Sequence, residues 1–142
     1  MKRQAFSLIS LLSLLLVAGS AIAQSRNVRA NVPFSFSVGD TTLPMGTYSI
    51  GAISSDAKTL LVQARGGSGV MVGSNAAESL TPASKTKLVF NRYRDQYFLA
   101  EIWVEGATLG RRLLKSSREK ELSKELAADL THQPVEVVAS LY

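Results

Sequence analysis

The sequence predicts a mainly β fold, a small antiparallel barrel or sandwich of about six to eight strands with one C-terminal amphipathic helix. From Val28 to Val38, apolar and polar side chains alternate with a period of two, which is typical of a half-buried strand. The run Lys87–Gly106 is the densest in β-branched and aromatic residues, and the polar Arg94-Asp95 pair interrupts it, which indicates a hairpin. A stripe of leucines four residues apart indicates the helix: Leu122, Leu126 and Leu130.

The N-terminal segment 1–23 has the three parts of a secretory signal peptide. Lys2 and Arg3 precede the apolar run Phe6–Val17, and Ala21-Ile22-Ala23 forms an A-x-A cleavage site. We therefore expect cleavage between Ala23 and Gln24, with export to the periplasm or the cell exterior. The alternative, an uncleaved anchor, needs a span of about 20 apolar residues, and this run is shorter. Residues 24–130 then form one β-rich domain, followed by a tail at 131–142.

Composition excludes several classes of protein. The formal charge of +5 falls to +3 when Lys2 and Arg3 leave with the signal segment, and charges of both signs alternate in the C-terminal third. That pattern does not predict a nucleic-acid surface. The absence of cysteine excludes a disulfide framework and a lipid anchor, so stability must come from a packed core.

The middle of the chain predicts short strands separated by turns. Pro33 places its strand at a sheet edge or beside a bulge. The remaining elements are a turn at Leu43–Thr47, strands at Thr47–Ser54, Thr59–Ala64 and Val70–Gly73, an irregular binding loop or connector at Asn75–Thr86, and a connector at Gly106–Lys115.

With a two-residue loop at Arg94-Asp95, the central hairpin pairs Arg92 with Tyr97, Phe90 with Leu99 and Leu88 with Glu101. One face is apolar and is assigned to the interior: Val89, Phe98, Ala100, Ile102 and Val104. The other face is mixed and includes Phe90, Leu99 and Trp103.

A helix at about 117–130 follows the hairpin. Ser116 and Glu119 have the spacing of a capping box at its start. We expect this helix to cover Trp103 on the mixed face of the hairpin. The tail after the helix is either an edge strand or a frayed end.

Catalytic, metal and cofactor sites are not predicted. His132 is the only histidine, and without cysteine it cannot build a zinc site or a serine triad of the usual kind. The one candidate binding surface is aromatic, because exposed rings beside an arginine can stack on a sugar or grip a peptide. Its residues are Trp103, Tyr97, Phe90 and Arg92. The competing interpretation, burial of these rings under the helix, is favoured.

Three stretches resemble a family of small exported β-rich proteins that is frequent in acidobacterial genomes: Val28–Ile50, Lys87–Gly106 and Gly110–Leu122. The family pattern is close to N-V-P-F, then L-P-A-G-x-Y, then R-Y-G-D-x-Y-F-L-x-E-I-W, then G-R-x-L-P-K-S-x-x-E. Arg94 stands where the pattern usually has Gly, and Leu114 where it usually has Pro. The resemblance implies export and a β-rich fold, and it brings no catalytic residues with it.

These observations together favour an exported, non-enzymatic protein that binds a partner or associates with the cell envelope. Two alternatives stay open. One is a small barrel that carries an apolar ligand inside, which a cavity in the structure would support. The other is an enzyme whose site would need convergent polar groups lined from residues 75–86.

Overall fold

The structure of this chain is a computed structural model, and it describes residues 27–127 and 133–142. The predicted cleavage site at Ala23 and Gln24, as well as Leu130 and His132, lie outside the described residues. The elements found are β1 (Val28–Val32), β2 (Phe36–Val38), β3 (Thr41–Leu43), β4 (Gly46–Ala52), β5 (Thr59–Ala64), β6 (Gly69–Glu78), β7 (Lys87–Tyr93), β8 (Gln96–Trp103), β9 (Leu109–Leu113), α2 (Ser117–Glu125), β10 (Gln133–Val138) and β11 (Ser140–Leu141).

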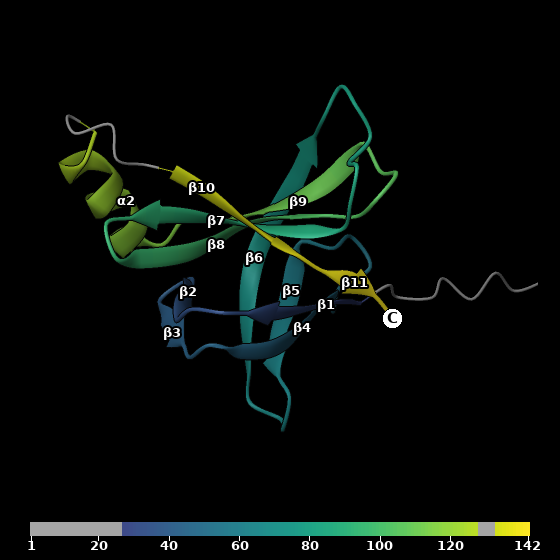
Figure 1. Cartoon of the computed structure of the whole chain (residues 1–142), viewed down its shortest axis with the longest axis horizontal. Helices are drawn as coiled ribbons and strands as arrows, with labels where there is room; N and C mark the ends of the chain where they lie inside the picture. The colour runs from purple at the N-terminus through teal and green to yellow at the C-terminus, as the bar shows by residue number, and fades with distance from the viewer. Residues whose placement is uncertain (1–26, 128–132) are drawn as a thin grey trace, which may run out of the picture.

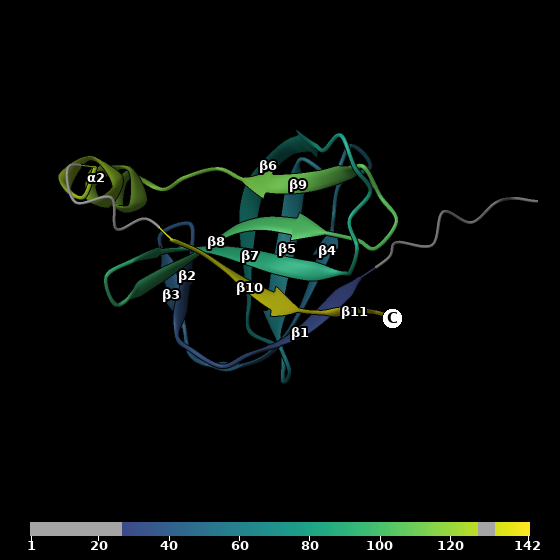
Figure 2. The same ribbon diagram turned by 45° about the horizontal axis from the view of Figure 1, so that its top comes forward.

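The strands form one hydrogen-bonded path in the order β10-β7-β8-β9-β6-β5-β4-β1-β11. β10 and β11, at its two ends, follow one another in the chain with only Ala139 between them. The C-terminal segment therefore pairs with β7 by its first half and with β1 by its second half. Figures 1 and 2 both show it crossing from one side of the sheet to the other. The sheet is open, because β10 and β11 are joined through the chain and not by hydrogen bonds to each other; we call this sheet with its connected ends the ring.

The predicted mainly β class with a C-terminal helix is confirmed, but there are more strands than the six to eight expected. Val28–Val32 alternates between buried and exposed residues, as its pattern predicts. The continuous strand expected up to Val38 is instead two, because Pro33 cannot donate to a ladder. The second piece, β2, forms a hairpin with β3 and also meets β8 in parallel through Ser37 and Phe98.

The core is not uniform along the ring. At one end, aromatic rings from four segments pack edge-to-face or stacked, at centroid distances of 3.9 to 5.3 Å: Phe34, Phe36, Tyr48, Phe90 and Tyr97. The other end contains aliphatic core residues: Val28, Ile50, Leu60 and Ile102. We call these the aromatic end and the pocket end. α2 and the turn between β7 and β8 lie at the aromatic end (Figure 1).

The hairpin of β7 and β8 forms as predicted near its turn. Arg92 pairs with Tyr97 and Phe90 with Leu99. Beyond that point a bulge between Val89 and Phe90 shifts the register. A shift of this kind changes which side chains share a face of the sheet.

The predicted assignment of side chains to the two faces of the hairpin is wrong, because the bulge shifts the register. Leu88 lies opposite Ile102, not opposite Glu101. Phe90 and Leu99, which the sequence places on the mixed face, are buried in the main core together with Ile102. Both faces of the hairpin are nevertheless covered, as its apolar composition indicates.

Two further stretches differ from the sequence prediction. β6 continues through Glu78, so that only residues 79–86 of the expected loop lack strand structure. The stretch Gly106–Lys115, expected to be a connector, contains β9, which pairs with both β6 and β8. Gly110 lies against Trp103 here, and a Cβ on this glycine would sit 2.7 Å from Cε3 of the indole. The strand depends on a residue that usually weakens strands.

The helix starts where predicted and covers a different part of the hairpin. The Ser116 side chain accepts a hydrogen bond from the Glu119 backbone N–H at 3.2 Å, as an N-cap does. α2 ends at Glu125, with Leu126 at its C-cap, instead of reaching residue 130. Leu126 packs in a second cluster with Tyr93 and Phe98 and not on Trp103.

A buried carboxylate joins the helix to the hairpin. Glu119 is buried, and its Oε1 accepts hydrogen bonds from Asn91 at 3.0 Å and from the hydroxyl of Tyr93 at 3.3 Å. Burial, reinforced by the charge of Glu119, raises the pKa of Tyr93.

A membrane-spanning helix, which has to be long and apolar, is not found in the part of the chain that the structure describes.

Candidate binding site

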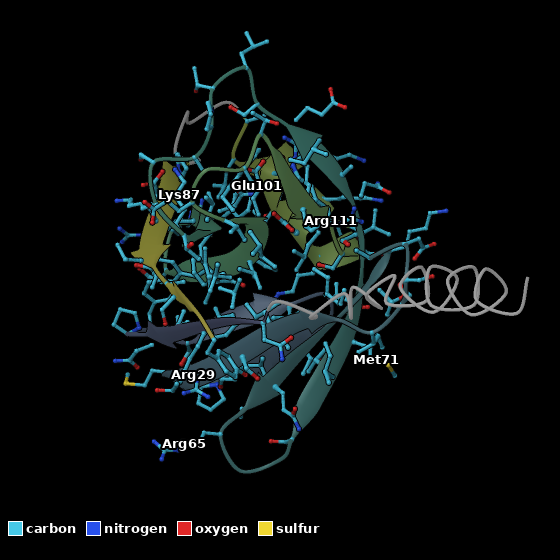
Figure 3. The ribbon with its side chains drawn as sticks, turned by 90° about the vertical axis from the view of Figure 1, so that its right-hand side faces the viewer. Arg29, Arg65, Met71, Lys87, Glu101 and Arg111 are labelled. Atoms are coloured by element: carbon cyan, nitrogen blue, oxygen red, sulfur yellow. The ribbon has the colours of Figure 1, made fainter. Side chains whose placement is uncertain are left out.

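A pocket of about 230 Å³ opens at the pocket end. Its lining residues come from β1, β4, β5, β6, β8 and β9 and from the turns beside them. Its floor reaches four core residues, and its mouth is formed by the ends of β4, β8 and β9. Figure 3 faces this end of the molecule. The lining is almost entirely aliphatic: Val28, Ile50, Gly51, Ala52, Ala57, Leu60, Ala76, Ile102, Val104, Leu109, Gly110 and Arg111.

The pocket exists because small residues occupy the positions around its mouth. Ala76 lies on the face of β6 that turns Val72 and Ser74 inward, and its methyl group leaves space above them. Ala52 and Ala57 border the same space from β4 and from the loop before β5. Among the residues that the structure describes, no aromatic side chain lines the pocket, since the interior rings are gathered at the aromatic end.

Arg111 is the one charged residue of this lining. It shares the inward face of β9 with the buried Leu113, two positions further along. Its guanidinium donates to Ser74 in three contacts: Nε to Oγ at 3.1 Å, Nη2 to Oγ at 2.9 Å, and Nη2 to the backbone oxygen at 2.9 Å. Figure 3 shows Arg111 near the middle of the view, within the ring.

The aromatic surface predicted from the sequence is not assembled. Phe90 has no exposed surface and Trp103 is 9% exposed, so neither ring is available to a ligand without rearrangement. Tyr97 is half-buried and stacks on Phe34, and Arg92 lies 5.5 Å from its ring centre. Tyr97 and Trp103 stand at opposite ends of β8.

Trp103 is covered by β9 instead of the predicted helix. Gly110 packs against the indole, and the indole Nε1 donates to Glu101 at 2.9 Å. Glu101 also pairs with Arg112 at 2.9 Å.

The loop at residues 79–86 borders a second pocket of about 410 Å³ beside Trp103. Ser79, Thr81 and Ser84 supply hydroxyl groups to it. Its one charged residue, Lys87, is held 2.6 Å from Glu136 in an ion pair. An enzyme site in this stretch would require several polar groups that converge on one point. Here the polar groups that line the pocket are hydroxyls and a lysine whose charge is paired with Glu136.

A third, polar pocket of about 350 Å³ lies on the outer surface of β1, β4 and β5. Arg29 stacks on the Tyr142 ring at 3.9 Å. Hydrogen bonds with Ser49 and Arg29 hold the pKa of the Tyr142 hydroxyl below its usual value. Arg65, which also lines this pocket, projects away from the ribbon in Figure 3, and most of the lining is polar or glycine.

Within residues 27–127 and 133–142, no three histidine, cysteine or carboxylate side chains gather in a way that could hold a metal ion.

No protein-family model, curated protein or solved structure matches this chain. We therefore infer a function from the geometry of the pocket end alone.

Proposed function

We propose that this protein is an exported, non-enzymatic binding protein of the cell envelope that holds a small apolar ligand in the pocket end of its ring. The observation that supports the proposal most directly is the 230 Å³ pocket, whose floor is the otherwise filled aliphatic core. Small-molecule sites are typically concave and mostly apolar, with a few polar groups that orient the ligand. This pocket has that composition on a small scale.

The size of the pocket sets the expected affinity. A ligand that buries five methylene groups gains about 4 kcal/mol at about 0.8 kcal/mol each, and because association also costs free energy, the dissociation constant should be no lower than about 1 mM. Hexan-1-ol is a suitable probe because its tail has this length and its head group has no charge.

The test is a titration of the purified protein with hexan-1-ol, followed by two-dimensional ¹H–¹⁵N NMR. We expect shifts confined to residues around the pocket, such as Ala76 and Leu109, with saturation in the millimolar range. Ala76→Leu should fill the pocket and remove the binding. Ala127→Leu, at an exposed position after α2, is the matched control and should leave binding unchanged.

An absence of saturable shifts, or full binding by Ala76→Leu, would overturn the proposal. Export has its own test, because the N-terminal mass of the protein recovered from a periplasmic or culture fraction should show a chain that begins at Gln24. An intact N-terminus in the membrane fraction would instead favour an uncleaved anchor.

A further inference from the structure

Arg111 is unusual among the arginines because it faces into an apolar pocket without an acidic partner. Its neighbour Arg112 faces outward and has the carboxylate of Glu101 at 2.9 Å. None of the ion pairs among the described residues includes Arg111. A cation beside an apolar lining attracts an anion more strongly than one in open water, because the local dielectric constant is lower.

The hydrogen bonds of Arg111 leave one side of its guanidinium available. Ser74 accepts hydrogen bonds from Nε and, through both its hydroxyl and its backbone oxygen, from Nη2. A guanidinium has five N–H donors, and both donors of Nη1 are without a partner in the described part of the chain. These donors can bind a ligand oxygen without breaking any contact to Ser74.

Ser74 holds the guanidinium in a defined position. Its hydroxyl donates to the backbone oxygen of Ala57 at 2.8 Å, and its backbone N–H donates to the backbone oxygen of Lys58 at 2.7 Å. Ser74 is itself buried. A charged group whose support is rigid loses less conformational freedom when it binds a ligand, which favours specific recognition.

We propose that the pocket selects a short-chain apolar monocarboxylate, with the carboxylate at Nη1 of Arg111 and the hydrocarbon tail on Val28, Ile50 and Leu60. This inference rests on the proposed function and adds the chemical class of the ligand. Arginine is suited to the role because its guanidinium stays protonated at all ordinary pH values and can offer the N–H donors of Nη1 to a carboxylate oxygen.

The volume of the pocket limits the length of the ligand. A water-sized group occupies about 30 Å³ in a liquid, so the 230 Å³ found here holds about eight such groups. Hexanoate has this number of non-hydrogen atoms. Long-chain fatty acids exceed the space unless part of the chain stays in solvent.

The test compares three probes with six carbon atoms each, hexanoate, hexan-1-ol and hexylamine, by NMR titration at pH 7. We expect hexanoate to bind about tenfold more tightly than hexan-1-ol, the effect of one charge-assisted hydrogen bond, and hexylamine to bind most weakly. Arg111→Met keeps an unbranched apolar side chain and should abolish the preference for hexanoate while hexan-1-ol still binds. Arg112→Met, the matched control, removes the neighbouring outward-facing arginine that does not line the pocket and should retain the preference.

The outcomes separate the two proposals. If hexan-1-ol binds to the pocket and hexanoate binds no more tightly, the anionic ligand is excluded and the apolar site survives. If no probe binds, both proposals fail. The three-probe comparison on the unmodified protein distinguishes these outcomes even if Arg111→Met does not fold.

Discussion

The two ends of the ring differ in how completely side chains fill the interior. At the aromatic end, five rings contact one another, and α2 adds a second cluster around Tyr93 and Phe98. At the pocket end, aliphatic and small side chains leave about 230 Å³ open. Because large aromatic side chains bury the most surface, most of the stability should come from the aromatic end. The other end is then free to keep an opening that a fully packed core would not allow.

The largest expected effect is a difference between two leucines that are equally buried, each 3% exposed. Leu99, paired with Phe90, lies toward the aromatic end, and Leu60 lines the pocket. Leu99→Ala should lower the free energy of unfolding by about 4 kcal/mol, because it leaves a closed cavity, and Leu60→Ala by about 2 kcal/mol, because the lost volume joins an open pocket. Urea denaturation of the two variants measures both values.

The same two variants also test the pocket by its preference for the chain length of the ligand. Leu60→Ala should now accept octan-1-ol better than hexan-1-ol, whereas Leu99→Ala should not change the length preference. Equal losses of stability from the two substitutions would contradict the comparison of the two ends.

A smaller effect of opposite sign is expected at the turn of the β7–β8 hairpin, at the aromatic end. Arg94 has φ of 55°, and Asp95 does not share a positive φ, which is the φ pattern of a type II′ turn. A side chain is strained at this position and glycine is not. Arg94→Gly should raise the melting temperature by about 3–6 °C, the shift that about 1 kcal/mol gives in a domain of this size. A scanning calorimetry value at or below that of the unmodified protein would rule out the II′ assignment.

The smallest effect concerns the ion pair that joins β10 to β7. A hydrogen bond from Lys87 at 2.6 Å and the charges of Lys87 and Lys85 hold the pKa of Glu136 below its usual value. The folded state then binds fewer protons than the unfolded state, so this stabilisation is present above about pH 4.5 and is lost as the pH falls through the lowered pKa.

Glu136→Gln should therefore cost less than about 1 kcal/mol at pH 7, since the carboxylate is partly exposed. In urea denaturation the cost should become smaller as the pH falls below about 4.5 and through the lowered pKa. Glu105→Gln, at an exposed position, is the control. A cost of Glu136→Gln that stayed the same over this fall in pH would show that charge is not involved.

Local sequence signals predicted much of the fold because they depend on neighbouring residues. The alternation in β1, the two-residue turn at Arg94 and the N-cap at Ser116 all have partners within a few positions. The bulge at Val89 left no such signal, and it changed which faces of the hairpin enter the core. β9 was not predicted because its glycine and arginines do not resemble a strand. Their fit depends on Trp103, Ser74 and Glu101, which are distant in the sequence.

The candidate site could not be predicted for the same reason. Its residues come from six strands and the turns beside them, and most are valine, alanine or glycine, which have no chemical signature on their own. The aromatic residues that the sequence indicated as a binding surface are used for packing. The only local signal for Arg111 is an arginine two positions before an apolar residue, in a strand that the sequence did not reveal.

The C-terminal segment has a consequence for association between molecules. An uncovered strand edge presents unpaired N–H and C=O groups and can recruit a second chain. β10 pairs with the edge of β7 and β11 with the edge of β1, so one short stretch of chain covers two edges and itself supplies the outermost strand at both ends of the path. If residues 133–141 detached, β7 and β1 would each present an unpaired edge, and we expect the protein to self-associate more readily.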